Sequence, residues 1–507
     1  MPDAGRQGTT ETKTMRASYE SPDLDSLAAL DQRVQDDLST LNYPPKNWIP
    51  PTKKPDGSDA LDVVIIGGGM GGLTACFALL RVGISNLRIF DRAEKNYEGP
   101  WTTYARMETL RSPKQLLGPA SGLPSLTFRG WYTALFGEAA WACLDKIPRT
   151  IWMDYLIWYR KTLSLPVENK VAVESVFPDG DLLRLTLSGP GIDDREVWAR
   201  RVVLATGREG LGAPVLPDFI EMVPRDRWAH SSEAIDFTAM LGKRVVLIGA
   251  GASAVENAAE ALEAGASEVR LLARREKMPQ INKMMGIGSP GLVAGFPVLS
   301  DEWRWRYLHY NNVLQTPAPR GSTLRVSRHD NAFFHFGVTI TKAKETPDGL
   351  VLKTTNGEFL ETDFIILGTG FDTDPHSQPV IATYADNILQ WRDQYTPPLG
   401  LEDEGLASFP YLNPDFSFME RNAGVTPWVK KIHCFNYGAK MTLGNISGDI
   451  PAISEGAAWL ARELAARFYV EDIEYHWQYL QDYETPELRG DEWIPSELPN
   501  SELSGKP

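Results

Sequence analysis

The sequence predicts an α/β protein with two Rossmann-like dinucleotide-binding domains and a helical N-terminal arm. The main observation is a pattern of strand, glycine-rich loop, helix and strand that occurs twice, over residues 62–92 and 244–275. Each copy is followed by a β-hairpin pattern and then by a buried strand that ends in Thr-Gly. The hairpin patterns cover 171–188 and 337–354, and the Thr-Gly strands cover 199–207 and 362–372. The chain therefore contains two copies of one plan.

The N-terminal arm is expected from hydrophobic spacing. Apolar residues recur every three or four positions, at Leu24, Leu27, Leu30, Val34, Leu38 and Leu41. This spacing is typical of one face of a helix. The stretch YPPKNWIPP at 43–51 ends the helix, since proline cannot continue one. Because an apolar stripe needs a surface to cover, we expect the arm to pack on the main body.

Two further helices are expected outside the repeated plan. The stretch TIWMDYLIWYRKTL puts Trp152, Tyr155, Leu156 and Tyr159 on one helix face, which favours a place in the core. The segment 444–468 reads as a loop that leads into an amphipathic helix. Residues 1–20 are polar, and the chain after 484 is rich in Pro and Glu, so we expect both ends to be loose.

The composition is that of a globular protein that does not bind nucleic acid. The 507 residues carry a formal net charge of −15, whereas nucleic-acid binding needs clustered basic residues. Cys76, Cys143 and Cys434 lie far apart and match no metal-ligand spacing, so no metal site is expected. The N-terminus lacks a signal-peptide pattern, and no apolar run is long enough to cross a bilayer. We expect a cytoplasmic monomer or homodimer without a membrane contact.

The first glycine loop fits G-x-G-x-x-G. Gly67 permits a tight turn, Gly69 lets the backbone approach a pyrophosphate, and Gly72 lets helix and strand pack closely. The helix that follows would direct its N-terminal N–H groups at the phosphates. Asp91 ends the second strand of this unit, where a carboxylate accepts hydrogen bonds from ribose hydroxyls and repels a 2′-phosphate.

The second glycine loop fits G-x-G-x-x-A, with Gly249, Gly251 and Ala254 at the three positions. Its second strand ends at Arg274 and Arg275. Guanidinium groups at this position suit the 2′-phosphate of NADPH, although a solvated basic strand end would show the same letters.

The different strand ends indicate why one chain needs two such units. FAD and NAD carry a free 2′-hydroxyl on the adenosine ribose, and NADPH carries a phosphate there. A protein with both sites can pass a hydride from the nicotinamide of NADPH to the flavin of FAD. We therefore expect FAD at the first loop and NADPH at the second.

At these residues the sequence resembles the class B flavoprotein monooxygenases, which include flavin-containing, Baeyer–Villiger and N-hydroxylating monooxygenases. The matching motifs are the loop at 67–72, EGPW at 98–101, LATG at 204–207, GAGASAVENA at 249–258 and LGTGFD at 367–372. The resemblance spans roughly 60–470. It implies an FAD domain with an inserted NADPH domain, in a three-layer ββα arrangement. The expected divisions are an N-terminal extension at 1–58, FAD-domain parts at 59–225 and 365–485, the NADPH domain at 226–364 and a tail at 486–507.

The resemblance also implies which residues contact the cofactors. The FAD contacts would be Gly67, Gly69, Gly71, Gly72, Asp91, Arg92 and Trp101, with Asp449 as a flavin-side contact or only a helix N-cap. The NADPH contacts would be Gly249, Gly251, Ser253, Ala254, Arg274 and Arg275. The turns Thr206–Gly207 and Thr369–Gly370 would lie where the chain passes between domains.

The motifs that separate the subclasses match incompletely. Flavin-containing monooxygenases usually have Asn after L-R-[ST], where this chain has Pro113. The Baeyer–Villiger pattern F-x-G-x-x-x-H-x-x-x-W keeps His230 but has Ala234 at the Trp position. The N-hydroxylating pattern is echoed by TLRSP and SLTF, but its F-A-T-G-Y is replaced by LGTGF. The sequence favours no subclass on these motifs.

The resemblance implies a monooxygenase that inserts one oxygen atom of O₂ into a small organic substrate through a C4a-(hydro)peroxyflavin. We expect N- or S-oxygenation, with Baeyer–Villiger oxidation or a flavin reductase without oxygen insertion as alternatives. Arg111 is a candidate donor to negative charge at the flavin, or an ion-pair partner. Ser112 stands near the position of the missing Asn, and His230 would orient or protonate near the nicotinamide unless it is structural.

Overall fold

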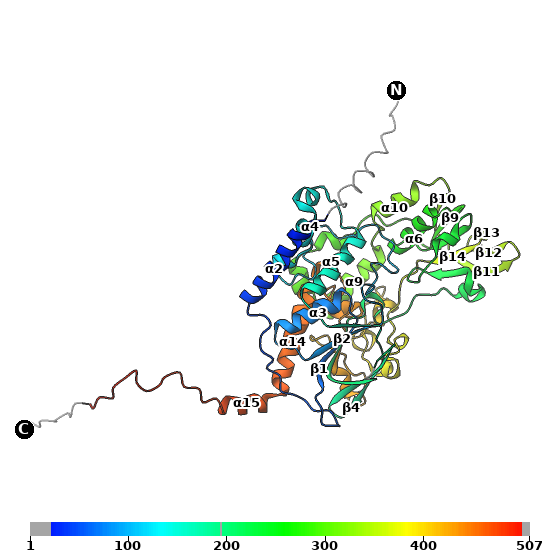
Figure 1. The fold of residues 1–507 in the computed structure, drawn as a ribbon. Coiled ribbons are helices and arrows are strands. Elements are labelled where there is room, and N and C mark those ends of the chain that lie inside the picture. Colours follow the sequence, from blue (N-terminus) through cyan, green and yellow to red (C-terminus); the bar gives the residue numbers. More distant parts are fainter. Residues whose placement is uncertain (1–21, 193–194, 499–507) are drawn as a thin grey trace, which may run out of the picture.

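The computed structural model describes residues 22–192 and 195–498, and it divides into two lobes (Figure 1). The first lobe contains a seven-stranded sheet in the order β3-β2-β1-β6-β5-β4, with β15 also paired to β6. The second contains a five-stranded sheet in the order β10-β9-β8-β14-β7 and a three-stranded sheet β11-β12-β13. All strands of the second lobe fall between β6 and β15 in the chain, so this lobe is inserted in the first, as expected.

The strand bounds follow the predicted plan. In the first lobe they are β1 Leu61–Ile66, β2 Leu87–Asp91, β3 Val167–Asn169, β4 Ala172–Asp179, β5 Leu182–Ser188, β6 Glu196–Leu204 and β15 Ile432–His433. In the second they are β7 Trp228–His230, β8 Arg244–Ile248, β9 Glu268–Ala273, β10 Ala332–Phe336, β11 Ile340–Thr346, β12 Gly349–Thr354, β13 Phe359–Thr362 and β14 Phe364–Leu367.

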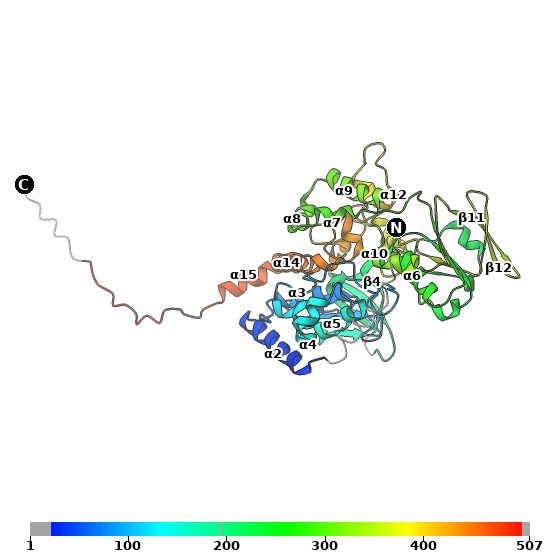
Figure 2. The ribbon, with the colours of Figure 1, turned by 90° about the horizontal axis from the view of Figure 1, so that it is seen from above.

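The helices cluster by lobe. The first lobe carries α2 Leu24–Thr40, α3 Met70–Arg81, α4 Phe128–Cys143, α5 Arg149–Thr162, α13 Lys440–Leu443, α14 Ile453–Glu471 and α15 Ile473–Gln481. The second carries α6 Ala252–Glu263 and α10 Arg320–Ser327. A third group contains α7 Lys283–Ile287, α8 Pro290–Gly295, α9 Asp301–Leu314, α11 Trp391–Gln394 and α12 Glu404–Ala407. Figure 2 shows α7, α8, α9 and α12 together at one edge of the molecule.

The central strands of the first sheet are parallel because helices cover them. β1 pairs in parallel with β2 and with β6, and five of its six residues are fully enclosed by protein. The helix α14 packs beside α3. At Gly456 on α14 the neighbouring backbone is so close that a Cβ would overlap the carbonyl oxygen of Ile446. The amphipathic helix expected within 444–468 is thus confirmed, beginning at Ile453.

The second lobe has three layers. Its five-stranded sheet buries Val245, Leu247 and Val269 against α6. The opposite face packs on the three-stranded sheet through contacts that include Val246 and Leu352. This is the ββα layering that the family resemblance implies.

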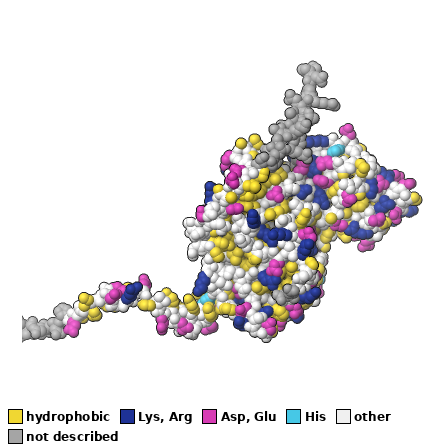
Figure 3. All heavy atoms as spheres, in the orientation of Figure 1, with side chains coloured by type: hydrophobic (Ala, Val, Ile, Leu, Met, Phe, Trp, Pro, Cys, Tyr) yellow, Lys and Arg dark blue, Asp and Glu magenta, His cyan; other side chains and the backbone are white. Residues whose placement is uncertain are grey.

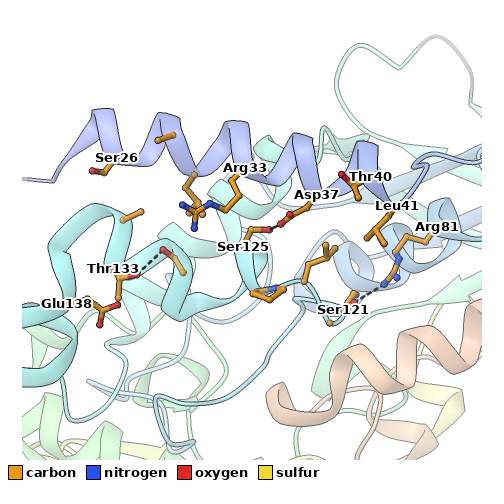
Figure 4. Close-up of a pocket in the computed structure, with 17 residues that line it drawn as sticks. Ser26, Arg33, Asp37, Thr40, Leu41, Arg81, Ser121, Ser125, Thr133 and Glu138 are labelled. Carbon is orange, nitrogen blue, oxygen red and sulfur yellow. Dashed lines mark hydrogen bonds between the residues drawn. The ribbon is translucent and has the colours of Figure 1, made fainter.

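The N-terminal arm packs on the body, as expected. α2 buries Leu30, Val34 and Leu38, while Leu24 and Leu41 at its ends remain exposed. Polar contacts anchor it, including a 2.7 Å bond from the Trp158 indole to Asp31. Beside it lies an open cavity of about 910 Å³, bordered by α2, the end of α3 and α4 (Figure 4).

The aromatic helix α5 lies in the core. Trp152, Tyr155, Leu156 and Tyr159 are all buried, and the Tyr155 hydroxyl donates to the carbonyl of Leu126. Hydrophobic side chains gather on the visible face over the helices of the first lobe, whereas acidic and basic side chains are interspersed over the second (Figure 3).

The C-terminal helix α15 and the segment after it lead away from the body (Figures 1 and 2). α15 buries none of its own side chains. Within the described ranges, no helix combines the length and apolar character needed to cross a membrane. The expectations for residues 1–20 and for the last nine residues fall outside the described chain.

Candidate cofactor and active site

The first glycine loop is held in shape by contacts that exclude side chains. Gly67 has φ +105°, and a Cβ there would lie 2.5 Å from the carbonyl oxygen of Ala205, the residue directly after β6. A Cβ on Gly72 would overlap the carbonyl oxygen of Gly67. Gly69 is the N-cap of α3 and brings no side chain, so the first amides of that helix are open to a ligand. The loop therefore has the geometry of a pyrophosphate cradle.

Asp91 lies beside this loop, but its carboxylate already has partners. One oxygen accepts a 2.7 Å hydrogen bond from the Gly68 amide, and the other accepts one of 2.7 Å from the Ala93 amide. The sequence assigned Asp91 only to a ribose. These two bonds tie the end of β2 to the glycine loop.

The segment after β2 crosses the loop. Gly99 lies 3.7 Å from where a Cβ on Gly69 would be. Trp101 is half-buried and meets Trp152 edge-on at 6.4 Å, and its carbonyl accepts a hydrogen bond from Arg149. Arg92 is exposed at the end of β2.

A polar cluster next to the loop was missed at the sequence level. The buried carboxylate of Glu98 accepts bonds of 2.6 Å from Arg160 and from Asn169. Glu98 and Arg160 border a small cavity that Gly68 and Gly69 also line. One signal was available: Asn169 ends β3 in register with Asp91, and carboxyl ends of parallel strands meet at one sheet edge.

The turn after β6 is braced by a loop from near the C-terminus. Asn436 donates from its side-chain amide to the Leu204 carbonyl at 3.2 Å and to the Thr206 hydroxyl at 3.1 Å. The carbonyl of Ser447 lies 3.8 Å from a Cβ placed on Gly71. Thr206, Gly207 and Gly71 are therefore brought together with the 436–449 segment.

Asp449 ends this segment at the start of a short 3₁₀ turn, and it makes no side-chain cap there. The Asp449 side chain is exposed at the surface. Desolvation by the surrounding protein atoms nevertheless raises the pKa of its carboxyl, although the positive charges of Lys440 and Arg208 act to lower it. The N-cap alternative is thus not supported, and a ligand-facing role stays a prediction.

The second glycine loop follows the plan of the first, except that alanine stands in place of glycine at the third motif position. Gly249 has φ +121°, and a Cβ there would lie 2.6 Å from the carbonyl oxygen of Gly368, the residue directly after β14. Ala254 is buried, and its Cβ lies 2.5 Å from where a Cβ on Gly368 would be. Gly251, the N-cap of α6, has no atom of the described chain within 4 Å of a built Cβ, and Ser253 beside it is exposed.

The two strand-end arginines behave differently. Arg275 is half-buried and donates to the carbonyls of Val313 at 2.8 Å and Asn312 at 3.2 Å, at the end of α9. Burial and the neighbouring Arg274 lower its pKa. Arg274 is exposed, so it is the guanidinium that remains available for a phosphate.

His230 lies buried at the end of β7, beside the Thr369–Gly370 turn. Its Nδ1 lies 2.7 Å from the Ser232 hydroxyl, and its Nε2 has no hydrogen-bond partner among the described residues. Burial lowers the pKa of His230, despite opposing effects of the Gly370 backbone and Glu233. An imidazole with one buried, unpaired nitrogen therefore lies next to this turn, and the lowered pKa favours its neutral form.

Arg111 and Ser112 lie between the lobes and are both half-buried. Arg111 donates to the Pro317 carbonyl at 2.9 Å instead of forming a close ion pair. It also faces Glu256, a buried carboxyl on α6 that sequence reasoning missed. Burial raises the pKa of Glu256 to about 7, although Ser322 donates to it and three arginines oppose the shift.

This arrangement defines an oxidoreductase with two dinucleotide sites. Residues 61–286 match the family model described as pyridine nucleotide-disulphide oxidoreductase. An FAD-dependent urate hydroxylase from Xanthomonas campestris pv. campestris is 35% identical over 470 residues, which cover 92% of this chain and 98% of that protein. The chain belongs to the class B flavoprotein monooxygenases, the FAD-dependent family that its motifs resemble.

Solved structures share the fold at low identity. An ornithine N-hydroxylase from Kutzneria sp. 744 has a TM-score of 0.62 at 17% identity, covering 80% of this chain and 99% of its own. A cadaverine monooxygenase from Erwinia amylovora, solved with FAD, has a TM-score of 0.60 at 15% identity, covering 87% and 100%.

Proposed function

We propose that this protein is an FAD- and NADPH-dependent monooxygenase that transfers one oxygen atom of O₂ to a small organic acid. The observation that carries the proposal is the pair of glycine loops with opposite strand ends, Asp91 in one and Arg274 with Arg275 in the other. When bound, FAD supplies electron transfer and oxygen activation. The chain's own residues bind, orient and shield the reactants.

The FAD assignment rests on how well the first loop fits a dinucleotide. The bare backbone at 67–72, the open amides of α3 and the free lone pairs of Asp91 match pyrophosphate and ribose in that order. Gly99, which Trp101 contacts, lies beside Gly69, and the Ser447 carbonyl lies beside Gly71. These segments would keep water from the bound cofactor.

The NADPH assignment rests on the second loop and on Arg274. The space around Gly251 leaves room for a pyrophosphate at the start of α6. Arg274 would take the 2′-phosphate, while Arg275 holds α9 against that strand end. His230, whose buried Nε2 has no partner among the described residues, would orient the nicotinamide where the two lobes meet.

For the reaction, the similarity to the urate hydroxylase supports hydroxylation of a urate-like acid over N- or S-oxygenation. The amine hydroxylases share only the fold at this identity. The Baeyer–Villiger alternative retains His230 but lacks the Trp of that pattern.

The test uses purified protein with NADPH, urate and ¹⁸O₂. The proposal predicts one labelled oxygen atom in the organic product, one in water, and NADPH consumption that rises with substrate. NADPH oxidation that releases peroxide or reduces an added acceptor, with no label in the product, would instead identify a reductase.

A further inference from the structure

One cluster at the carboxyl edge of the first sheet is not used by the proposed cofactor contacts. Two cations lie close to the ring of Tyr437: the Arg208 guanidinium is 4.9 Å from the ring centroid and the Lys440 ammonium is 5.2 Å from it. Lys440 also donates to the Tyr437 hydroxyl at 3.3 Å. Phe409 packs on the same ring at 5.8 Å.

The chain brings this cluster to the edge where ligands bind in such sheets. Arg208 directly follows the Thr206–Gly207 turn at the end of β6. Tyr437 and Lys440 follow β15, which pairs with β6, and the chain then reaches the position opposite Gly71. In open parallel sheets the ligand lies outside the carboxyl ends of the strands, so these side chains stand next to the expected flavin end.

Positive charge is in excess around Tyr437. Lys440 and Arg208 are opposed by Asp449, and Arg111 acts electrostatically on Arg208. Tyr104 lies beside Glu209, and the charges of Arg208 and Arg92 act on the pKa of its hydroxyl. Burial opposes ionisation of Tyr437, yet Lys440 and Arg208 lower its pKa, so the local potential is positive.

We propose that Arg208, Tyr437 and Lys440 bind the anionic group of the substrate and make this protein select a planar acid over an amine. This inference rests on the proposed function, whose oxygen transfer would take place at the same edge. An ammonium substrate such as ornithine or cadaverine would be repelled by Lys440 and Arg208. Urate is an anion at neutral pH, and its oxo groups suit ammonium, guanidinium and phenol donors.

The test is a titration of the oxidised, FAD-loaded protein, followed by the flavin spectrum and by calorimetry. The probes are urate, ornithine, lysine and cadaverine. We expect saturable binding of urate and at least tenfold weaker binding of each amine. Lys440→Gln should weaken urate binding about tenfold or more, because one charge-assisted hydrogen bond is lost. Tyr437→Phe should weaken it less and keep the fold.

Lys430→Gln is the matched control, because Lys430 is an exposed lysine on the same segment. It should leave urate binding unchanged, and all variants should keep wild-type FAD content and NADPH-driven flavin reduction. The inference is overturned if wild-type protein binds an amine as well as urate or fails to bind urate. It is also overturned if both cluster variants bind urate normally, or if they lose FAD, which would assign the cations to the cofactor. Failure of the proposed function appears separately, as wild-type protein that transfers no labelled oxygen.

Discussion

The two glycine loops solve the same problem with different residues. In the first unit the helix carries Gly72 and the neighbouring strand end carries Ala205; in the second the helix carries Ala254 and the strand end carries Gly368. In the second unit a Cβ on Gly368 would lie 2.5 Å from the Cβ of Ala254, whereas in the first unit Gly72 is confined by the carbonyl of Gly67. The close approach of Ala254 accounts for glycine at the second position of LGTGF.

The residues at the two strand ends combine structural contacts and ligand binding in different ways. Asp91 fixes its loop through the Gly68 and Ala93 amides, and it is also the residue proposed to bind the ribose of the ligand. In the second unit these tasks are separate, since Arg275 is tied to the end of α9 and Arg274 is exposed. Changes at Asp91 should therefore affect folding and binding together, whereas changes at Arg274 should affect binding alone.

The largest effect is expected at the tightest glycine of the first loop. In Gly72→Ala the new methyl group would overlap the Gly67 carbonyl, so we expect protein that is insoluble or lacks flavin. Gly251→Ala is the matched control, because its methyl group meets no described atom within 4 Å. It should fold with full flavin content and bind NADPH more weakly. Flavin absorbance per chain measures the cofactor content of each variant, and thermal melting measures its stability. A yellow Gly72→Ala protein with wild-type stability would contradict the packing argument.

The glycine–alanine exchange can be tested by a double-mutant cycle. Gly368→Ala should cost about 1–3 kcal/mol, because its methyl group would press on that of Ala254. Adding Ala254→Gly removes the Cβ contact but leaves the Cα at 2.7 Å and the amide nitrogen at 2.9 Å, so it should recover only part of the loss, and glycine in a helix costs about 1 kcal/mol by itself. Denaturant unfolding of the four proteins measures the coupling. Simple additivity would mean that the two positions do not compensate.

Variants of Arg274 and Arg275 should separate the selection of the coenzyme from the stability of the fold. Arg274→Ala should raise the KM for NADPH about 10- to 100-fold and leave the KM for NADH unchanged, because a charged hydrogen bond to phosphate is lost. Arg275→Ala should mainly lower thermal stability, since it frees the end of α9. Steady-state kinetics with both coenzymes and melting curves test this; equal losses for both coenzymes in Arg274→Ala would refute the phosphate assignment.

A smaller, pH-dependent effect on stability is expected from a difference between the second turns of α3 and α6. Thr74 on α3 donates to the Met70 carbonyl, whereas Glu256 at the corresponding place on α6 is a buried carboxyl. Burial raises its pKa to about 7, from an ordinary value of 4.5. The unfolded chain therefore ionises first, and stability falls as pH rises between these values.

Glu256→Gln should remove this loss. Its melting temperature relative to wild type should be higher at about pH 8 than at about pH 5. A difference that does not change with pH would mean that the arginines around Glu256 keep it ionised in the folded protein.

The sequence was sufficient for local features and insufficient for contacts between distant segments. The strand–loop–helix units, the Thr-Gly turns and the apolar face of α2 follow from spacing within a few residues, and all are confirmed. The contact of Arg275 with α9, the Glu98 cluster with Arg160 and the burial of Glu256 were not predicted. These contacts depend on how loops and helices far apart in the chain meet, and no short-range periodicity encodes that.

The most direct measurement of the central claim is anaerobic reduction of the purified yellow protein by NADPH and by NADH. Stopped-flow absorbance follows the loss of oxidised flavin. Two sites of opposite selectivity predict rapid bleaching by NADPH at concentrations far below those needed with NADH, and a preference that disappears in Arg274→Ala. Flavin that stays oxidised, or bleaches equally with both coenzymes, would contradict the account.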